Sequence, residues 1–413
     1  MLKLLSAIIF FTPWASSALG LPAAAPRPLS LGETYALAAA RSEALALQAE
    51  GAAQLDAAER QLAAAFRPAF DFNASLSKQQ NADTAARGYF SGSYNIFSGM
   101  RDYMAAKAAS EKTAAARLDL ERARQQLYLS AAQAYLGLQA AQREAQIRED
   151  QLEVTARRIS ELEARAAIGR SRRSEVISAK AQLAQDKAAH LSALSAERLA
   201  QQALKFLTGL QEDLAPAALP ARLAADLPAY LDLAARRPDL EARRRDAAAA
   251  GFLSEVQELG GRPAVNLLAN YYVLRTPRPD PVNRWDAGAF LSVPLYTGGL
   301  LRGRKEAAWA GKRSAQTALD LALRQALSDV RSAYDDYEFS SRQAESLAEA
   351  LALADENARY QVEDYKLGLV NNLEVLSALN TAQQTRLALS QAQARKTLAL
   401  IKLETAAGAE IKP

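Results

Sequence analysis

Few side chains in this sequence could carry out covalent or metal chemistry. His190 is the only histidine among 413 residues, and there is no cysteine. A catalytic triad would have to use His190, and a structural metal site built from histidine or cysteine needs several such ligands. The aspartates and glutamates are scattered at helical spacing, and no catalytic pair stands out among them. The sequence therefore predicts a protein that is not an enzyme, with no catalytic residue, no metal site and no cofactor.

The charged residues whose spacing suggests a function follow two glycines, Gly169 and Gly368. Like charges repel at close range, and a nearby arginine offsets that repulsion. We expect arginines after the first glycine to hold acidic residues after the second, as an electrostatic lock between two helix ends. The alternative is that they are ordinary solvated charges, because exposed ion pairs contribute little. The residues are Arg170, Arg172, Arg173, Glu175 and Glu374.

The overall charge indicates no strongly charged partner. Fifty basic residues nearly balance 46 acidic ones, for a net charge of +4. Nucleic-acid-binding proteins gather their basic residues on one face. We therefore expect no nucleic-acid partner.

Two long stretches without proline must form the elements that position these charges. No proline occurs between Pro68 and Pro216, or between Pro294 and Pro413. Proline breaks helix interiors, and the alanine, leucine and charged residues that fill both stretches favour helix. We expect one unbroken helix from Arg101 to Ile168, about 100 Å long at about 1.5 Å per residue. Apolar residues repeat along it every seven positions, which predicts coiled packing against other helices; examples are Leu138, Ala145, Leu152, Ile159 and Ala166.

The chain contains an internal repeat with an offset of 199 residues. Phe97-Ser98-Gly99 corresponds to Tyr296-Thr297-Gly298, and Ile168-Gly169 corresponds to Leu367-Gly368. Each copy is expected to run helix, strand, strand, long helix, turn, helix, with a glycine ending each long helix. We divide the chain into a first repeat (21–210), an inter-repeat linker (211–228), a second repeat (229–407) and a C-terminal tail (408–413).

Each repeat also carries two segments that alternate every second residue. Phe70, Phe72 and Leu76 alternate with polar residues in the first segment, and Phe90 and Tyr94 do so in the second. In the second repeat, one face is expected to carry Val265, Leu267, Ala269, Tyr271 and Val273, and then Trp285, Ala287, Ala289, Leu291, Val293 and Leu295. Such segments of about ten residues are typical of outer-membrane strands. Aromatic residues near their ends suit interfacial girdles; they are Phe66, Tyr89, Phe97, Trp285 and Tyr296.

Four strands cannot close a membrane barrel. Backbone groups in lipid must all be paired, so the sheet has to close, and outer-membrane barrels need at least about eight strands. Two chains would supply eight strands and three chains would supply twelve. Eight-stranded barrels are filled by their own side chains, whereas larger ones leave an aqueous lumen. The residues that alternate with the apolar ones and would face the lumen are small and polar. They favour the trimer, whose larger barrel leaves an aqueous channel.

The N-terminus resembles a secretory signal peptide. Lys3 is followed by an apolar stretch up to Trp14 and by small residues before a candidate cleavage site at Ala18-Leu19-Gly20. This three-part layout predicts export of the chain and removal of residues 1–20.

The duplicated pattern resembles the TolC-like outer-membrane efflux protein family. The stretch Leu291 to Gly299 looks like the family's strand-to-helix junction, and Arg67-Pro68-Ala69 resembles the start of its first strand. Gly368-Leu369-Val370, followed by Leu373 to Ala378, looks like its second hairpin tip. The resemblance implies a mostly α-helical chain with duplicated long helical hairpins and four transmembrane β-strands. Three copies would form a 12-stranded β-barrel on an α-helical periplasmic tunnel.

The same resemblance implies partners and tip residues. Such a homotrimer lies in the outer membrane of a Gram-negative bacterium, extends into the periplasm, and receives cargo from an inner-membrane pump through a periplasmic adaptor protein. Glu374 matches an acidic gate position of the family, Ser377 falls at its second acidic position, and Glu175 is the first-repeat counterpart of Glu374. Adaptor contacts fall at the tips, on Ile168, Gly169, Leu367, Gly368 and Leu369.

Two functions remain open at this point. The first is a trimeric exit channel of a tripartite efflux or type I secretion system, which conducts cargo passively. The second is a periplasmic coiled-coil adaptor or structural protein without a pore. The four alternating segments and the duplicated tip favour the channel, since an adaptor hairpin needs neither.

Overall fold

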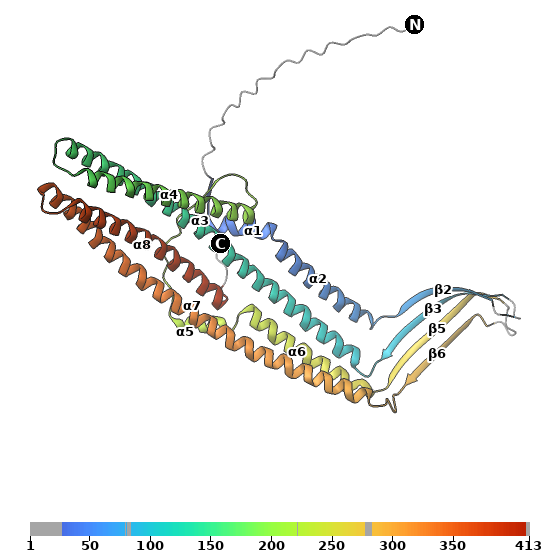
Figure 1. Cartoon of the computed structure of the whole chain (residues 1–413). Helices are drawn as coiled ribbons and strands as arrows, with labels where there is room; N and C mark the ends of the chain where they lie inside the picture. The colour runs from blue at the N-terminus through green and yellow to red at the C-terminus, as the bar shows by residue number, and fades with distance from the viewer. Residues whose placement is uncertain (1–26, 79, 81–83, 221, 277–282, 410–413) are drawn as a thin grey trace, which may run out of the picture.

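A computed structural model describes residues 27–78, 80, 84–220, 222–276, 283–409 of the chain. The molecule is long and narrow, with helices along most of its length and four strands at one end (Figure 1). The expected signal peptide and most of the expected C-terminal tail lie outside the described residues. None of the helices within the described ranges is both long and apolar enough to cross a bilayer.

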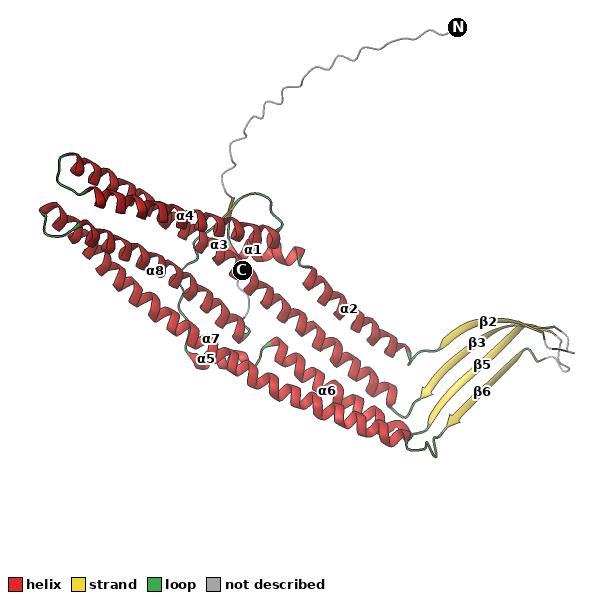
Figure 2. Cartoon of the chain, in the orientation of Figure 1, coloured by secondary structure: helices red, strands yellow, loops and turns green. Residues whose placement is uncertain are grey.

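The same order of elements occurs twice (Figure 2). The first series comprises α1 (Leu31–Arg41), α2 (Glu43–Ala64), β2 (Ala69–Ser77), β3 (Ala85–Phe97), α3 (Arg101–Ala167) and α4 (Arg173–Thr208). The second comprises α5 (Leu227–Ala234), α6 (Pro238–Glu258), η1 (Leu259–Gly261), β5 (Ala264–Thr276), β6 (Trp285–Ser292), α7 (Leu300–Leu367) and α8 (Asn372–Ala407). The fold is therefore mostly α-helical, with two long helical hairpins and four paired strands, as the sequence predicts.

The two longest helices follow the proline-free stretches. Helix α3 has 67 residues and α7 has 68, and Gly137 does not interrupt α3. Both begin after a left-handed turn. Gly298 and Gly299 adopt it before α7, with φ of 60° and 88°, whereas Gly99 and Met100 adopt it before α3, with φ of 69° and 71°. A left-handed conformation costs a non-glycine residue roughly 1–2 kcal/mol, so the first junction is the more strained one.

The helices lie side by side in the same order as the strands. Helix α6 packs between α3 and α7 in the half next to the sheet, and α2 packs on α3. In the other half, α4 packs on α3, and α8 packs on both α7 and α3 (Figure 1). Each long helix therefore links one end of the molecule to the other and is supported by a different shorter helix in each half.

The four strands form one antiparallel sheet in the order β2-β3-β5-β6. The alternating segments predicted from the sequence are present, with two corrections. Val273, which was expected on the same face as Tyr271, is the extra residue of a β-bulge. Strand β6 ends at Ser292, so Val293 and Leu295 lie outside it. Pro294 explains the early end, because proline has no N–H to donate to a neighbouring strand.

A second, two-stranded sheet was not expected. Strand β1 (Arg27–Leu29) pairs in parallel with β4 (Leu214–Pro216). Strand β4 lies within the predicted inter-repeat linker (211–228). The hydroxyl of Tyr135 on α3 donates to the Leu29 carbonyl at 2.9 Å or to the Ala217 carbonyl at 2.7 Å. Tyr135 is fully buried, so it ties the small sheet to the middle of α3.

Candidate functional site at the helix tips and the sheet faces

The two hairpin tips are turns that glycine makes possible. Gly169 and Gly368 have φ of 74° and 78°, in the left-handed region. A Cβ atom added to either glycine would meet nothing within 4 Å, so backbone conformation, not space, favours glycine there. Three of the predicted adaptor contacts project beside them and are largely exposed, namely Ile168 (67%), Leu367 (74%) and Leu369 (71%).

The predicted charged residues at the tips do not form the expected lock within one chain. Among the described residues, no ion pair joins Arg170, Arg172 or Arg173 to an acidic residue of the second hairpin, and all three are exposed. Instead, Glu374 accepts a hydrogen bond from the Asn371 backbone N–H at 3.1 Å. The Asn371 side chain in turn accepts from the Glu374 backbone N–H, which makes a capping box at the start of α8.

Glu175 and Ser377 take different positions. Glu175 is half-buried and accepts from the Ser171 hydroxyl at 2.6 Å, and the hydroxyl of Tyr365 on α7 lies 3.4 Å from the same carboxylate oxygen. Glu175 therefore does reach the other hairpin, through a tyrosine. Ser377 is exposed on α8, one turn beyond Glu374.

The contacts between the two hairpins come from residues that sequence reasoning missed. Arg158 on α3 is only 5% exposed, and it donates from Nε and Nη2 to Oδ1 of Asn372 on α8 at 3.1 and 3.0 Å. Its guanidinium lies 4.1 Å from the ring centre of Tyr365, and that of Arg165 lies 4.8 Å from the same ring. No sequence signal marks these residues, because the repeat offset does not relate them to one another.

An apolar cluster directly behind the tips joins all four helices. Its buried members are Ile159 and Leu162 of α3, Ala179 of α4, Tyr365 of α7, and Val375 and Leu376 of α8. Ile159 belongs to the predicted seven-residue stripe. This cluster fixes where Arg158 and Tyr365 can lie, since core side chains pack at high density.

A buried carboxylate lies further along the hairpins. Asp186 of α4 is 6% exposed. It accepts hydrogen bonds from Gln151 at 3.0 Å and Thr155 at 2.8 Å, both on α3, and from Gln182 at 2.9 Å. The Gln151 amide also lies 3.4 Å from Asn380 of α8. Buried polar groups that are satisfied in this way fix the register of packed helices.

The sheet has two chemically different faces. The cross-strand pairs Phe72–Phe90, Phe90–Tyr271 and Tyr271–Trp285 place large apolar side chains on one face. Phe70 is 80% exposed there and Leu76 is 76% exposed. The opposite face carries hydrogen-bonded polar pairs; Asn73 donates to Ser91 at 2.8 Å, and Asn270 donates to Asp286 at 2.9 Å. This is the pattern of a strand set with lipid on one side and water on the other.

Four of the five predicted girdle residues lie near an end of the sheet, and their role in a girdle stays a prediction. Phe66 and Tyr296 lie at the helix end of the sheet, and Phe97 pairs there with Val265 on the apolar face. Trp285 lies at the loop end, opposite Tyr271. Tyr89 is a correction, because it pairs with Asn73 on the polar face and its ring lies 5.4 Å from that of Tyr272.

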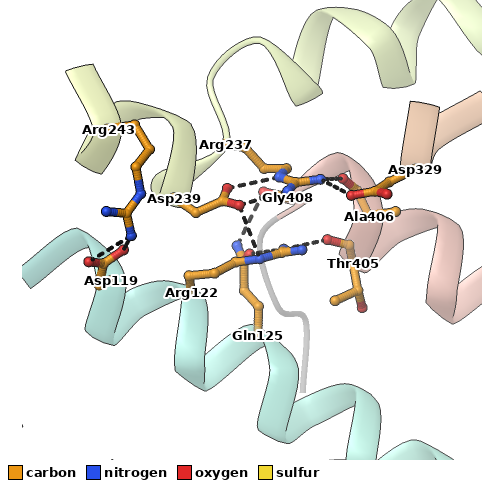
Figure 3. A network of polar contacts seen from close by, with 10 residues as sticks. All are labelled: Asp119, Arg122, Gln125, Arg237, Asp239, Arg243, Asp329, Thr405, Ala406 and Gly408. Carbon is orange, nitrogen blue, oxygen red and sulfur yellow. Dashed lines mark hydrogen bonds and ion pairs between the residues drawn. The ribbon is translucent and has the colours of Figure 1, made fainter. Parts of the chain in front are cut away.

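Midway along the helices, a polar network holds the end of α8 (Figure 3). Arg237, before α6, is 6% exposed and donates to Asp239, to Asp329 of α7 and to the Ala406 carbonyl of α8. Arg122 of α3 donates to the Thr405 carbonyl at 2.7 Å. The last carbonyls of α8 therefore accept from Arg122 of α3 and from Arg237 before α6, which satisfies groups that a helix end leaves unpaired.

Burial and neighbouring charge shift the carboxyl groups of this region in opposite directions. Burial alone would raise the pKa of Asp239, but the hydrogen bonds and charge of Arg237, with the charge of Arg122, lower it below its ordinary value. For Asp119 of α3, burial raises the pKa, and Arg243 offsets this rise only in part. The network is structural, and in the described part of the chain no group of three histidines or carboxylates could hold a metal ion.

Comparison with known proteins identifies this architecture. Residues 229–409 match the family model of outer membrane efflux proteins. The chain is 24% identical over 353 residues to the outer membrane efflux protein BepC of Brucella suis. The alignment covers 83% of this chain and 77% of that protein.

Two solved structures share the fold. The outer membrane protein VceC of Vibrio cholerae superposes with a TM-score of 0.81 at 23% identity, over 92% of this chain and 96% of that one. The open state of the outer membrane channel MtrE of Neisseria gonorrhoeae gives a TM-score of 0.80 at 20% identity, over 92% and 89%. The fold is thus that of TolC-like outer-membrane channels. The chain is therefore similar to outer membrane efflux proteins in its second repeat, which the family model matches, and in its overall fold.

Proposed function

We propose that three copies of this chain form an outer-membrane exit channel. The observation that carries the proposal is the open sheet with one apolar and one polar face, whose edge strands are β2 and β6. In lipid, the unpaired backbone groups of an edge strand cost several kcal/mol each, so β2 of one copy must pair with β6 of the next. Three copies close a 12-stranded barrel with the apolar face towards lipid and the polar face towards an aqueous lumen.

The helices then form the periplasmic part of the same channel. At about 1.5 Å per residue, α3 and α7 each extend about 100 Å away from the barrel. Exposed apolar residues remain along both hairpins in a single copy, for example Phe206 (88%) on α4 and Phe339 (67%) on α7. Neighbouring copies would cover such side chains, since burial of apolar surface drives association.

The tips are the proposed gate and docking point. The exposed Ile168, Leu367 and Leu369, with the turn residues Gly169 and Gly368, would contact a periplasmic adaptor protein that links the channel to an inner-membrane pump. Glu374, Ser377 and Glu175, with Arg170, Arg172 and Arg173, would line the closed end between copies. Within each copy, Arg158 and Tyr365 hold the two hairpins together. We include both residues in the proposed gate.

Two further parts of the proposal concern the barrel and the chain organisation. Phe66, Phe97 and Tyr296 would form the inner aromatic girdle and Trp285 the outer one. The chain would consist of two structural repeats, at 21–210 and 229–407, that arose by duplication. Cargo passes without reaction, so no catalysis is proposed.

Fractionation and conductance test the function. The protein should be recovered in the outer membrane as a trimer that dissociates on heating, and it should form channels in a planar bilayer. Recovery as a soluble periplasmic protein without conductance would instead support the adaptor or structural alternative.

A further inference from the structure

Two arginines lie opposite each other at the loop end of the polar face. Arg87 of β3 pairs with Ser75 of β2 on one side and with Arg275 of β5 on the other. Like charges directly opposite on neighbouring strands are destabilising. Among the described residues, no carboxylate lies within ion-pair distance of either guanidinium. Within the described residues the two arginines therefore concentrate positive charge at this end of the polar face, and Arg275 also interacts electrostatically with the Asp286 carboxylate of β6.

A β-bulge puts Arg275 on this face. The pairing of β3 with β5 shifts by one residue between Gly88 and Tyr89. Tyr89 pairs with Tyr272, whereas Gly88 pairs with Leu274. Val273 is the extra residue. Without it, strict alternation would place Arg275 on the apolar face, because it is three residues from Tyr272.

A side-chain contact supports the same orientation. The Arg275 guanidinium lies 4.9 Å from the ring centre of Tyr272. Residues three apart on a regular strand point to opposite faces, so this contact requires the bulge. Bulges commonly redirect a side chain to a functional position. Here the redirected side chain joins a second arginine and leaves Leu274 to continue the apolar face.

The acidic residues of the polar face lie deeper in the strands. Asp71, Ser91, Asn270 and Asp286 form one row of cross-strand partners. The Asp286 carboxylate accepts from Asn270. Asp71 is four residues from Ser75 along β2, about 13 Å at 3.3 Å per residue. An anion that arrives from the loop side therefore meets the arginines before it meets the carboxylates.

We propose that Arg87 and Arg275 form an anion-binding site at the outer end of the lumen, with six arginines in a trimer. The inference rests on the proposed channel function. Its ligands are soluble polyvalent oxyanions, such as phosphorylated solutes, because planar guanidinium groups bind phosphate and carboxylate oxygens in pairs. Lipid phosphates share this chemistry, but they lie outside the barrel, whereas both arginines belong to the polar face.

Sided block of single channels tests the site. Inositol hexakisphosphate is added to one side of a planar bilayer and then to the other. We expect it to block the wild-type channel from the loop side at concentrations at least tenfold lower than from the helix side. The R87S/R275S channel should lose this difference, and R87K/R275K should keep most of it because the charge remains. The control for loss of one charge is R342S, at an exposed arginine of α7 that pairs with Glu338. Inositol hexakisphosphate should block the R342S channel as it blocks wild type.

The outcomes separate the site from the channel. Trimer formation by each variant is checked first on unheated gels, and the single variants R87S and R275S replace the double variant if it does not assemble. Equal block of wild type and R87S/R275S would overturn the anion site and leave the channel intact. Another outcome is that the double variant differs from wild type in conductance only in bilayers that contain lipopolysaccharide, with the same block by inositol hexakisphosphate. That result would assign the arginines to lipid binding and would also overturn the anion site. A wild-type trimer without any conductance would overturn the proposed function itself.

Discussion

Arg158 and Asn372 join the two helical hairpins near their tips. Two nitrogens of the Arg158 guanidinium share the Oδ1 atom of Asn372, at 3.1 and 3.0 Å, and both side chains are buried. The arginine also stacks on Tyr365. Hydrogen bonds to a charged group contribute about 1.5–3 kcal/mol each when buried, so this contact is a strong restraint on separation of α3 from α8.

Removal of this restraint should open the tips. In R158A, the Asn372 and Tyr365 side chains lose their partner, and we expect a several-fold rise in single-channel conductance. N372A should have a smaller effect, because the stacking of Arg158 on Tyr365 remains. R157A, which removes the exposed neighbouring arginine, is the control and should conduct like wild type. If R158A trimers assemble and their conductance is unchanged, Arg158 does not restrain the gate.

The long helices and the strands could be predicted because their signals are local. Absence of proline over the lengths of α3 and α7 and the alternation in β2 each depend on neighbouring residues alone. Gly169 and Gly368 marked the tips because only a left-handed residue fits those turns. The positions of the predicted hairpins therefore required no knowledge of contacts between distant segments.

The parts that were missed depend on distant partners. The bulge at Val273 arises from pairing with β3 and leaves no mark in the alternation of β5. Strand β4 has only three residues and exists because β1 lies beside it. Arg158 looks like any helical arginine until Asn372, 214 positions away, is placed next to it. Sequence periodicity carries no information about such pairs.

The two faces of the sheet should tolerate charge differently. In F72R, an arginine would replace a phenylalanine on the apolar face, beside Phe90. An arginine facing lipid near the middle of a strand costs about 2–4 kcal/mol. N73R places the same side chain one residue later, on the polar face. We expect a strong loss of folded trimer in the outer membrane for F72R and little loss for N73R, measured by heat-modifiable bands. Equal yields would contradict the assignment of the apolar face to lipid.

The buried carboxylate of Asp186 should stabilise the hairpins. D186A would remove the acceptor of Thr155 and Gln182 and leave Gln151 with only its longer contact to Asn380. Each unsatisfied buried donor costs about 1–3 kcal/mol, so we expect a loss of about 3 kcal/mol in the free energy of unfolding. D186N keeps one acceptor oxygen and should lose less. K187A, on the exposed neighbour, should lie within about 0.5 kcal/mol of wild type. Urea unfolding followed by helical circular dichroism measures all three, and a D186A trimer as stable as wild type would refute this role.

Two carboxylates of the central network should affect stability with opposite signs. The pKa of Asp239 is lowered in the folded chain, so its ionised form stabilises the fold at pH 7, and this contribution is lost as the pH falls through about 4 and below. The pKa of Asp119 is raised, so its ionisation at pH 7 opposes folding. We therefore expect D239N to lower the melting temperature at pH 7 and D119N to raise it.

The pH dependence completes the test. Below the ordinary pKa of aspartate, the unfolded chain binds the proton before folded Asp239 does, so the stabilisation by ionised Asp239 declines and the difference between D239N and wild type should shrink. The advantage of D119N should disappear as well, because Asp119 is then protonated in both the folded and the unfolded chain. Melting curves of detergent-solubilised trimers at pH 3, 5 and 7 measure both trends. A D239N variant that is as stable as wild type at pH 7 would show that Arg237 and Arg122 hold the end of α8 without help from this carboxylate. The network would then depend on Asp329 and the carbonyls of Thr405 and Ala406 alone.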